Sequence, residues 1–196
     1  MEFFLHCSEI FGYQTLDFKI LKSIGRPGEI IISNHPSLLD VVFFISSIKN
    51  LNCVVKGKLS SNIFLSPAIK ASGYILNNNN EDFLYAAINA LKNCESVLIF
   101  PEGSRTEKEI IFHKAAAYIS IKGAKTLTPV FMNMSPKSLK KNQKWYNTPK
   151  VKIKYTFKIG KSLDIASFNP NRPIPIRARL LHEELKQIYK KEINYD

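Results

Sequence analysis

The chain alternates between short, continuous apolar runs and longer stretches in which apolar residues recur every three or four positions. Short runs of this kind are typical of buried strands, and the periodic stretches are typical of amphipathic helices. Strands are predicted at residues 30–32, 53–55, 73–76, 97–100 and 126–131, and helices at 60–72, 81–93, 112–122 and 173–193. This alternation predicts a single α/β domain in which helices flank a mixed sheet.

Two later segments have patterns of their own. Residues 150–159 alternate lysines with apolar side chains, which predicts a strand with one basic and one apolar face. The apolar members are Val151, Ile153, Tyr155, Phe157 and Ile159. In the last predicted helix, the inward-facing residues are expected to be Leu180, Leu181, Leu185 and Ile188.

A histidine and an acid occur in residues 33–40 (SNHPSLLD), which connect the first predicted strand to the apolar run 41–45. Pro36 suits the first position of a helix, because its missing N–H would be unpaired there anyway. Residues five apart within one helix point about 140° away from each other. His35 and Asp40 can therefore meet only if His35 precedes the helix and its ring folds back. Asp40 would then hold one ring nitrogen and leave the other as a base. The alternative is a capping histidine beside a solvated acid.

A second polar group, residues 101–105 (PEGSR), follows the strand predicted at 97–100. Gly103 lets a ligand approach the backbone closely, and Arg105 offers a planar fork suited to phosphate. Glu102 could hold that arginine or bind a hydroxyl group. The alternative is an ordinary turn with a surface ion pair.

Composition narrows the choice of partner. The chain has 196 residues and a net charge of +12, from 28 basic and 16 acidic residues, which favours an anionic partner. Three unpaired cysteines indicate a reducing compartment and no metal site. No apolar run approaches the ~20 residues that cross a bilayer, and residues 1–6 do not resemble a secretory signal. Any contact with lipid is therefore expected at the cytoplasmic face of the inner membrane, as a peripheral protein.

Together, residues 34–40 and 100–105 resemble the paired signatures of the lysophospholipid acyltransferase family, which includes the 1-acylglycerol-3-phosphate acyltransferases. The first of these is the family's HX4D motif. The resemblance runs from about residue 28 to about residue 155. It looks closest to bacterial members from aryl polyene biosynthesis clusters, through residues 35–42, 73–75 and 145–146.

The resemblance implies a glycerolipid acyltransferase-like fold and transfer of an acyl group from a thioester to a lysophospholipid hydroxyl. The donor would be acyl-coenzyme A or acyl carrier protein, with no bound cofactor. His35 would be the base and Asp40 its partner. Contacts to the acceptor are expected from Glu102, Gly103, Ser104, Arg105 and Lys56.

The chain departs from the family pattern at several positions. Asparagines occupy residues 77–80, where many relatives carry an arginine that holds phosphate, and Ala115 stands where relatives often have glycine. A lyso-ornithine lipid or an aryl polyene glycolipid is therefore an alternative acceptor. His113, beside the matching basic residue Lys114, is interpreted as incidental.

Residues 1–196 are expected to form one acyltransferase domain. It comprises an apolar segment at 1–27 that packs on the core or contacts membrane, a motif-bearing core at 28–160, and a C-terminal helix at 173–193. A surface made by Trp145 and the lysines Lys150, Lys152 and Lys154 is expected to dock on an anionic membrane or an acyl carrier protein. The rival from another class is a basic nucleic-acid- or membrane-binding module without catalysis. It ranks lowest because it leaves both motifs unexplained.

Overall fold

The computed structural model describes residues 13–15, 18–37, 40–56, 74–77, 81–103, 111–138, 149 and 151–193. Two of the predicted segments lie outside these residues: the helix at 60–72 and the apolar residues at the start of the chain.

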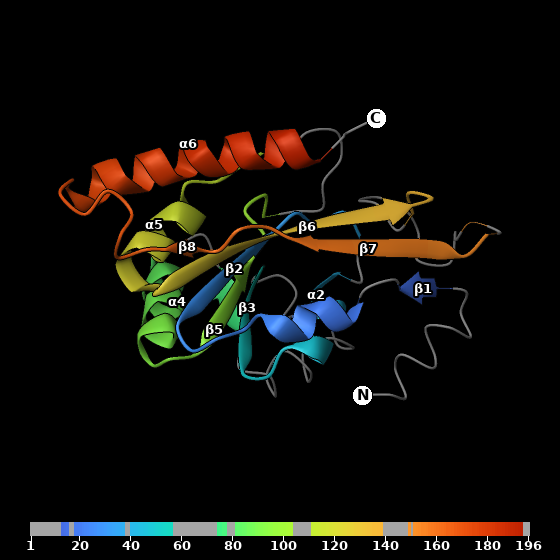
Figure 1. Cartoon of the computed structure of the whole chain (residues 1–196). Helices are drawn as coiled ribbons and strands as arrows, with labels where there is room; N and C mark the ends of the chain where they lie inside the picture. The colour runs from blue at the N-terminus through green and yellow to red at the C-terminus, as the bar shows by residue number, and fades with distance from the viewer. Residues whose placement is uncertain are drawn as a thin grey trace.

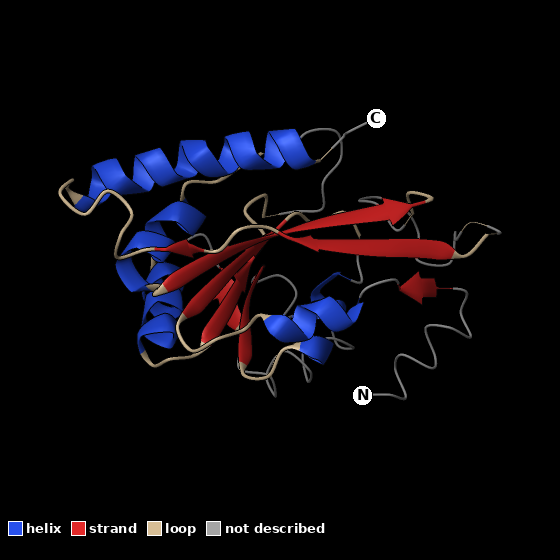
Figure 2. Cartoon of the chain, viewed as in Figure 1, coloured by secondary structure: helices blue, strands red, loops and turns tan. Residues whose placement is uncertain are grey.

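Within the described residues, eight strands form one mixed sheet between two sets of helices (Figures 1 and 2). The strands are β1 (Tyr13–Thr15), β2 (Glu29–Ser33), β3 (Leu51–Lys56), β4 (Ile75–Asn77), β5 (Ser96–Ile99), β6 (Thr126–Ser135), β7 (Ile153–Ile159) and β8 (Leu163–Asp164). Their order is β1-β7-β6-β2-β5-β3-β4, with β8 beside β6. The pairs from β6 through β4 are parallel, whereas β7 and β8 run antiparallel to β6. The predicted single domain with a mixed sheet flanked by helices is confirmed.

The helices cover both faces of this sheet. They are the 3₁₀ helix η1 (Phe18–Ser23) and the α-helices α2 (Asp40–Ser47), α4 (Asp82–Lys92), α5 (Ala115–Gly123) and α6 (Ile174–Glu192). Helices α4, α5 and α6 pack on one face, and α2 with η1 packs on the other (Figure 1).

Strand β2 lies in the middle of the sheet and shows why an unbroken apolar run forms a strand here. Ile30 and Ile32 belong to the core under α4, α5 and α6, whereas Ile31 belongs to the core under α2. All three side chains are fully buried. Successive side chains of a strand point to opposite faces, so a strand covered on both faces needs apolar residues at every position.

The N-terminal end of β2 is held by a buried carboxylate. Glu29 Oε2 accepts hydrogen bonds from the backbone N–H groups of Gly25 and Arg26, each at 2.7 Å. The hydroxyl of Thr128 on β6 donates to the other carboxylate oxygen. These contacts fix where β2 begins, and so they help to set the position of the loop at its far end.

Four details differ from the sequence-based expectations. The described part of the second helix begins at Asp40, so Pro36 lies in the preceding loop and not at the first helical position. The helix predicted at 112–122 begins at Ala115. Leu180 is 39 % exposed, because α6 turns it away from the sheet. Val151 is 62 % exposed, because it precedes β7.

The other inward-facing predictions for the last two segments are confirmed. Leu181 and Leu185 are fully buried, and Ile188 packs partly buried against the same core. In β7 the buried residues are Ile153, Tyr155 and Phe157. No helix in the described part of the chain is long and apolar enough to span a membrane.

Candidate active site

Two polar loops meet at one edge of the sheet because their strands are parallel neighbours. Strand β2 pairs with β5 in the register Ile32 to Ile99. The loop after β2 carries His35, and the loop after β5 carries Glu102. Ligand sites in parallel sheets form at the carboxyl ends of strands, and this is where the two loops lie.

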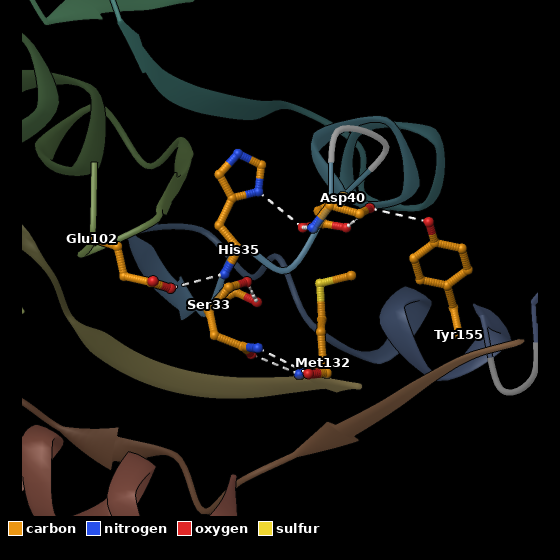
Figure 3. Close-up of polar contacts among 8 residues, drawn as sticks. Ser33, His35, Asp40, Glu102, Met132 and Tyr155 are labelled. Carbon is orange, nitrogen blue, oxygen red and sulfur yellow. Dashed lines mark hydrogen bonds and ion pairs between the residues drawn. The ribbon is translucent and has the colours of Figure 1, made fainter. Parts of the chain in front are cut away.

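The side chains of His35 and Asp40 are in contact. His35 Nδ1 lies 2.9 Å from Asp40 Oδ2, with His35 outside the helix and Asp40 at the first described residue of α2. Asp40 is fully buried, whereas 17 % of the His35 side chain is exposed. Figure 3 shows the ring with one nitrogen facing Asp40 and the other, Nε2, directed away from it. The contact with Asp40 therefore engages Nδ1 and leaves Nε2 out of it.

The Asp40 carboxylate is held by three donors from the loop before the helix. Besides His35 Nδ1, Asp40 Oδ2 accepts the backbone N–H of Ser37 at 2.8 Å. Asp40 Oδ1 accepts the hydroxyl of Ser37 at 2.5 Å. The hydroxyl of Tyr155 on β7 donates in turn to Ser37 Oγ at 3.1 Å. A buried charge needs such donors to offset its desolvation.

Ser37 and Tyr155 are not among the site residues predicted from the sequence. Ser37 lies inside the first motif, so its position beside Asp40 was a usable signal. Tyr155 is 118 residues from Ser37 and was predicted only as part of an apolar strand face. No local pattern in the sequence pairs these two residues.

The His35 loop is bound to the neighbouring strand by Asn34. The side-chain amide of Asn34 donates to the carbonyl of Met132 at 2.8 Å, and its oxygen accepts the N–H of Met132 at 2.7 Å. Met132 lies in the part of β6 beyond its pairing with β2. Asn34 therefore extends the ladder between these strands with its side chain.

Glu102 contacts the backbone of His35. Its Oε1 accepts the His35 N–H at 3.0 Å, and the Glu102 residue is only 7 % exposed. The His35 ring stacks on Phe100, with ring centroids 4.3 Å apart and an interplanar angle of 26°. The second loop thus supports both the main chain and the ring of His35.

Gly103 and His113 are neighbours beside this support. Gly103 has a φ of 59°, a conformation that favours glycine. A Cβ atom built on Gly103 would lie 3.7 Å from His113 Cδ2. The N–H of His113 also bonds to the carbonyl of Pro101 at 2.9 Å. His113, interpreted from the sequence as incidental, lies against the second motif.

The structure places only some of the remaining predicted site residues, and Lys56 is at the same carboxyl edge of the sheet because β3 runs parallel to β5. Lys56 ends β3, with its backbone in register with Asn77 of β4. Lys152 and Lys154 are exposed, the latter on β7. The residues Ser104, Arg105, Trp145 and Lys150 lie outside the described part of the chain. Among the described residues, no cluster of His, Cys, Asp or Glu could hold a metal ion.

Comparisons with known proteins give a family and a fold. A family model described as Acyltransferase matches residues 17–133. The chain is similar to the crystal structure of the 1-acyl-sn-glycerophosphate (LPA) acyltransferase PlsC from Thermotoga maritima, with a TM-score of 0.56 and 20% identity. The match covers 84% of this chain and 67% of that chain. A search of curated proteins found no match. Since the family model covers more than half of the chain, including both polar loops, this protein belongs to the acyltransferase family.

Proposed function

We propose that the protein moves a fatty acyl group from an acyl thioester to a hydroxyl of a lysophospholipid such as 1-acylglycerol-3-phosphate, with His35 as the general base. The observation that carries this proposal is the 2.9 Å contact between His35 Nδ1 and the buried Asp40 carboxylate. A carboxylate at Nδ1 favours the tautomer in which Nε2 has a free lone pair. The ring nitrogen that faces away from Asp40 then becomes the basic one.

The reaction proceeds by direct attack. His35 Nε2 accepts the proton of the acceptor hydroxyl as its oxygen forms a bond to the thioester carbonyl carbon. The C–S bond breaks, and the thiolate leaves with the proton that the imidazolium returns. Asp40 stabilises the imidazolium while it carries this proton. The products are an ester and a free thiol.

The acceptor's polar end is assigned to the second motif. Glu102, Gly103, Ser104 and Arg105 would hold it, with the Arg105 fork binding phosphate or a similar anion. The position of Glu102 beside the His35 backbone supports this, because it places the motif next to the base. Lys56 would add a positive charge near the developing oxyanion.

Docking on an anionic membrane surface is the second element of the proposal. The enzyme would act as a peripheral protein at the cytoplasmic face of the inner membrane. Support comes from the exposed lysines Lys152 and Lys154, to which the sequence adds Lys150 and Trp145. The same charges suit an acidic acyl carrier protein, which would deliver the donor in place of acyl-coenzyme A.

The test is acceptor-dependent release of thiol by the purified protein. Two donors, acyl-coenzyme A and acylated acyl carrier protein, are supplied in separate reactions. Each is tested with 1-acylglycerol-3-phosphate, a lyso-ornithine lipid or an aryl polyene glycolipid as acceptor. We expect thiol release with 1-acylglycerol-3-phosphate, together with its diacyl product by mass spectrometry. Thiol release with only one of the other two lipids would support the proposed acyl transfer but would show that 1-acylglycerol-3-phosphate is not the acceptor. No release with any acceptor would contradict the proposal.

A further inference from the structure

A chain of hydrogen bonds runs from β7 to the candidate base. The Tyr155 hydroxyl donates to Ser37 Oγ at 3.1 Å, and Ser37 Oγ donates to Asp40 Oδ1 at 2.5 Å. Asp40 Oδ2 contacts His35 Nδ1 at 2.9 Å. Figure 3 shows Tyr155 and His35 on opposite sides of the Asp40 carboxylate. Tyr155 thus lies two hydrogen bonds from the Asp40 carboxylate and three from the His35 ring.

The position of the tyrosine hydroxyl is fixed by packing. Tyr155 is fully buried, and its ring meets Phe43 edge-on with centroids 4.7 Å apart. Phe43 lies in α2, the helix that begins at Asp40. The same helix therefore places both the carboxylate and the surface against which the tyrosine ring packs. A buried ring in a dense core has little freedom to turn.

The hydrogen-bond inventory of a serine explains what this hydroxyl does. A serine hydroxyl has one proton and two acceptor lone pairs, and it rotates to suit its partners. When Tyr155 donates to Ser37 Oγ, the serine proton is left to point at Asp40. Donation into the hydroxyl also polarises it and strengthens its own donated bond. Asp40 is then held in the orientation in which its other oxygen faces His35.

We propose that Tyr155 is a positioning residue for acyl transfer, acting through Ser37 on the Asp40 carboxylate. The inference rests on the proposed role of His35 and Asp40. Tyr155 lies outside residues 17–133, the part of the chain that the acyltransferase family model matches. A strand beyond the matched region therefore completes the hydrogen bonding of the candidate catalytic pair.

The first test is Tyr155→Phe, which removes the hydroxyl and keeps the ring. Tyr189→Phe is the matched control, because Tyr189 is equally buried and its hydroxyl bonds to the carbonyls of Ile32 and Val130. Both variants lose one buried hydroxyl, so both should show a lower melting temperature. We expect kcat of Tyr155→Phe to fall about tenfold with KM for both substrates unchanged, and kcat of Tyr189→Phe to stay within about twofold. Equal kcat values for the two variants would overturn the proposal.

The second test asks whether Tyr155 acts through Ser37. In a Ser37→Ala background the tyrosine has no hydroxyl to orient, so Tyr155→Phe should lower kcat no further. If the losses from the two substitutions multiplied, Tyr155 would act by another route, and the proposal would be wrong.

The third test does not need turnover, so it separates this inference from the proposed function. Histidine-selective ¹⁵N labelling, with the His35 signal assigned by its absence in His35→Gln, reports the ring proton at Nδ1. We expect that proton to exchange with solvent about tenfold faster in Tyr155→Phe and at the parental rate in Tyr189→Phe. Parental exchange in Tyr155→Phe contradicts the positioning role, even if the protein transfers no acyl group.

Discussion

Glu102 Oε1 accepts the backbone N–H of His35 at 3.0 Å, although 67 residues separate them in the chain. This bond joins the loop after β5 to the loop after β2. It fixes the main chain at the residue whose side chain is the proposed base. The second motif therefore positions the first, in addition to any contact that it makes with substrate.

The first prediction concerns this bond. Glu102→Gln keeps an oxygen that can accept the His35 N–H, whereas Glu102→Ala leaves that group without this acceptor. An unpaired buried donor costs about 1–3 kcal/mol. We expect kcat/KM to fall at least tenfold further in Glu102→Ala than in Glu102→Gln. If the two variants lose activity equally, the carboxylate charge matters and the bond to His35 does not.

The second prediction concerns the attachment of the His35 loop to β6. Asn34→Ala removes two hydrogen bonds to the backbone of Met132 and should lower the free energy of unfolding by about 2–4 kcal/mol in urea titrations. Asn133→Ala is the control. Asn133 is exposed on the same strand, and its side chain bonds locally, accepting the N–H of Met134, so its loss should cost less than about 0.5 kcal/mol. Similar losses from both substitutions would contradict this role for Asn34.

The third prediction concerns pH and His182. Burial lowers the pKa of His182 from its usual 6.5, with Lys186 and Lys114 acting in the same direction and Glu183 opposing them. The unfolded chain therefore binds the proton at a higher pH than the folded chain. Stability contributed by the neutral ring is present above pH 6.5 and is lost as the pH falls through the folded-state pKa.

His182→Gln should accordingly flatten the decline in unfolding free energy between about pH 7 and pH 5, measured by urea titration. His113→Gln is the control, since His113 is exposed, and it should leave the slope as in the parent. An unchanged slope in His182→Gln would show that this ring is not responsible for the pH dependence.

The fourth prediction concerns docking. Lysines near an anionic leaflet contribute about 1 kcal/mol each, within a Debye length of roughly 8 Å at physiological salt. Replacing Lys150, Lys152 and Lys154 by Glu should weaken flotation with anionic liposomes while sparing activity on a detergent-solubilised acceptor. The parent protein should bind anionic liposomes, more weakly as the salt concentration rises, and should not bind neutral liposomes.

The control for docking is a triple Lys→Glu variant with the same change in net charge at another part of the surface. Lys22, Lys92 and Lys122 are exposed lysines in the last turns of η1, α4 and α5. Their triple replacement by Glu should leave most liposome binding intact. If both triple variants bind equally, net charge and not this surface attracts the membrane. If activity falls only with carrier-protein donors, the surface receives the donor.

The parts of the site that follow local patterns were predictable from the sequence. The isoleucines of β2 and the apolar run of β5 identify two buried strands, and a polar residue after each of them identifies the site's edge. Helical geometry gave the condition for a contact between His35 and Asp40, namely that His35 precedes the helix, and the structure meets that condition. His35 lies in the loop and Asp40 is the first described residue of α2. The backbone N–H of Ser37, in the same loop, also donates to the Asp40 carboxylate.

What depends on tertiary packing was not predictable. Asn34 bonds to Met132 across 98 residues, and Tyr155 reaches Ser37 across 118, so neither pair leaves a local signal. Leu180 was expected to face inward with Leu181. Adjacent residues of a helix point about 100° apart, so when Leu181 is buried Leu180 faces outward.

The fifth prediction tests the acyl-transfer mechanism itself. Asp40→Asn should impair turnover by favouring the wrong tautomer of the His35 ring, with the fold retained by circular dichroism. The most direct measurement is kcat of purified His35→Ala, assayed by thiol release with 1-acylglycerol-3-phosphate. Loss of the general base should lower kcat by about 10²–10⁴-fold in a protein that melts near the parental temperature. Turnover by folded His35→Ala at near the parental rate would contradict the assignment of His35 as the base.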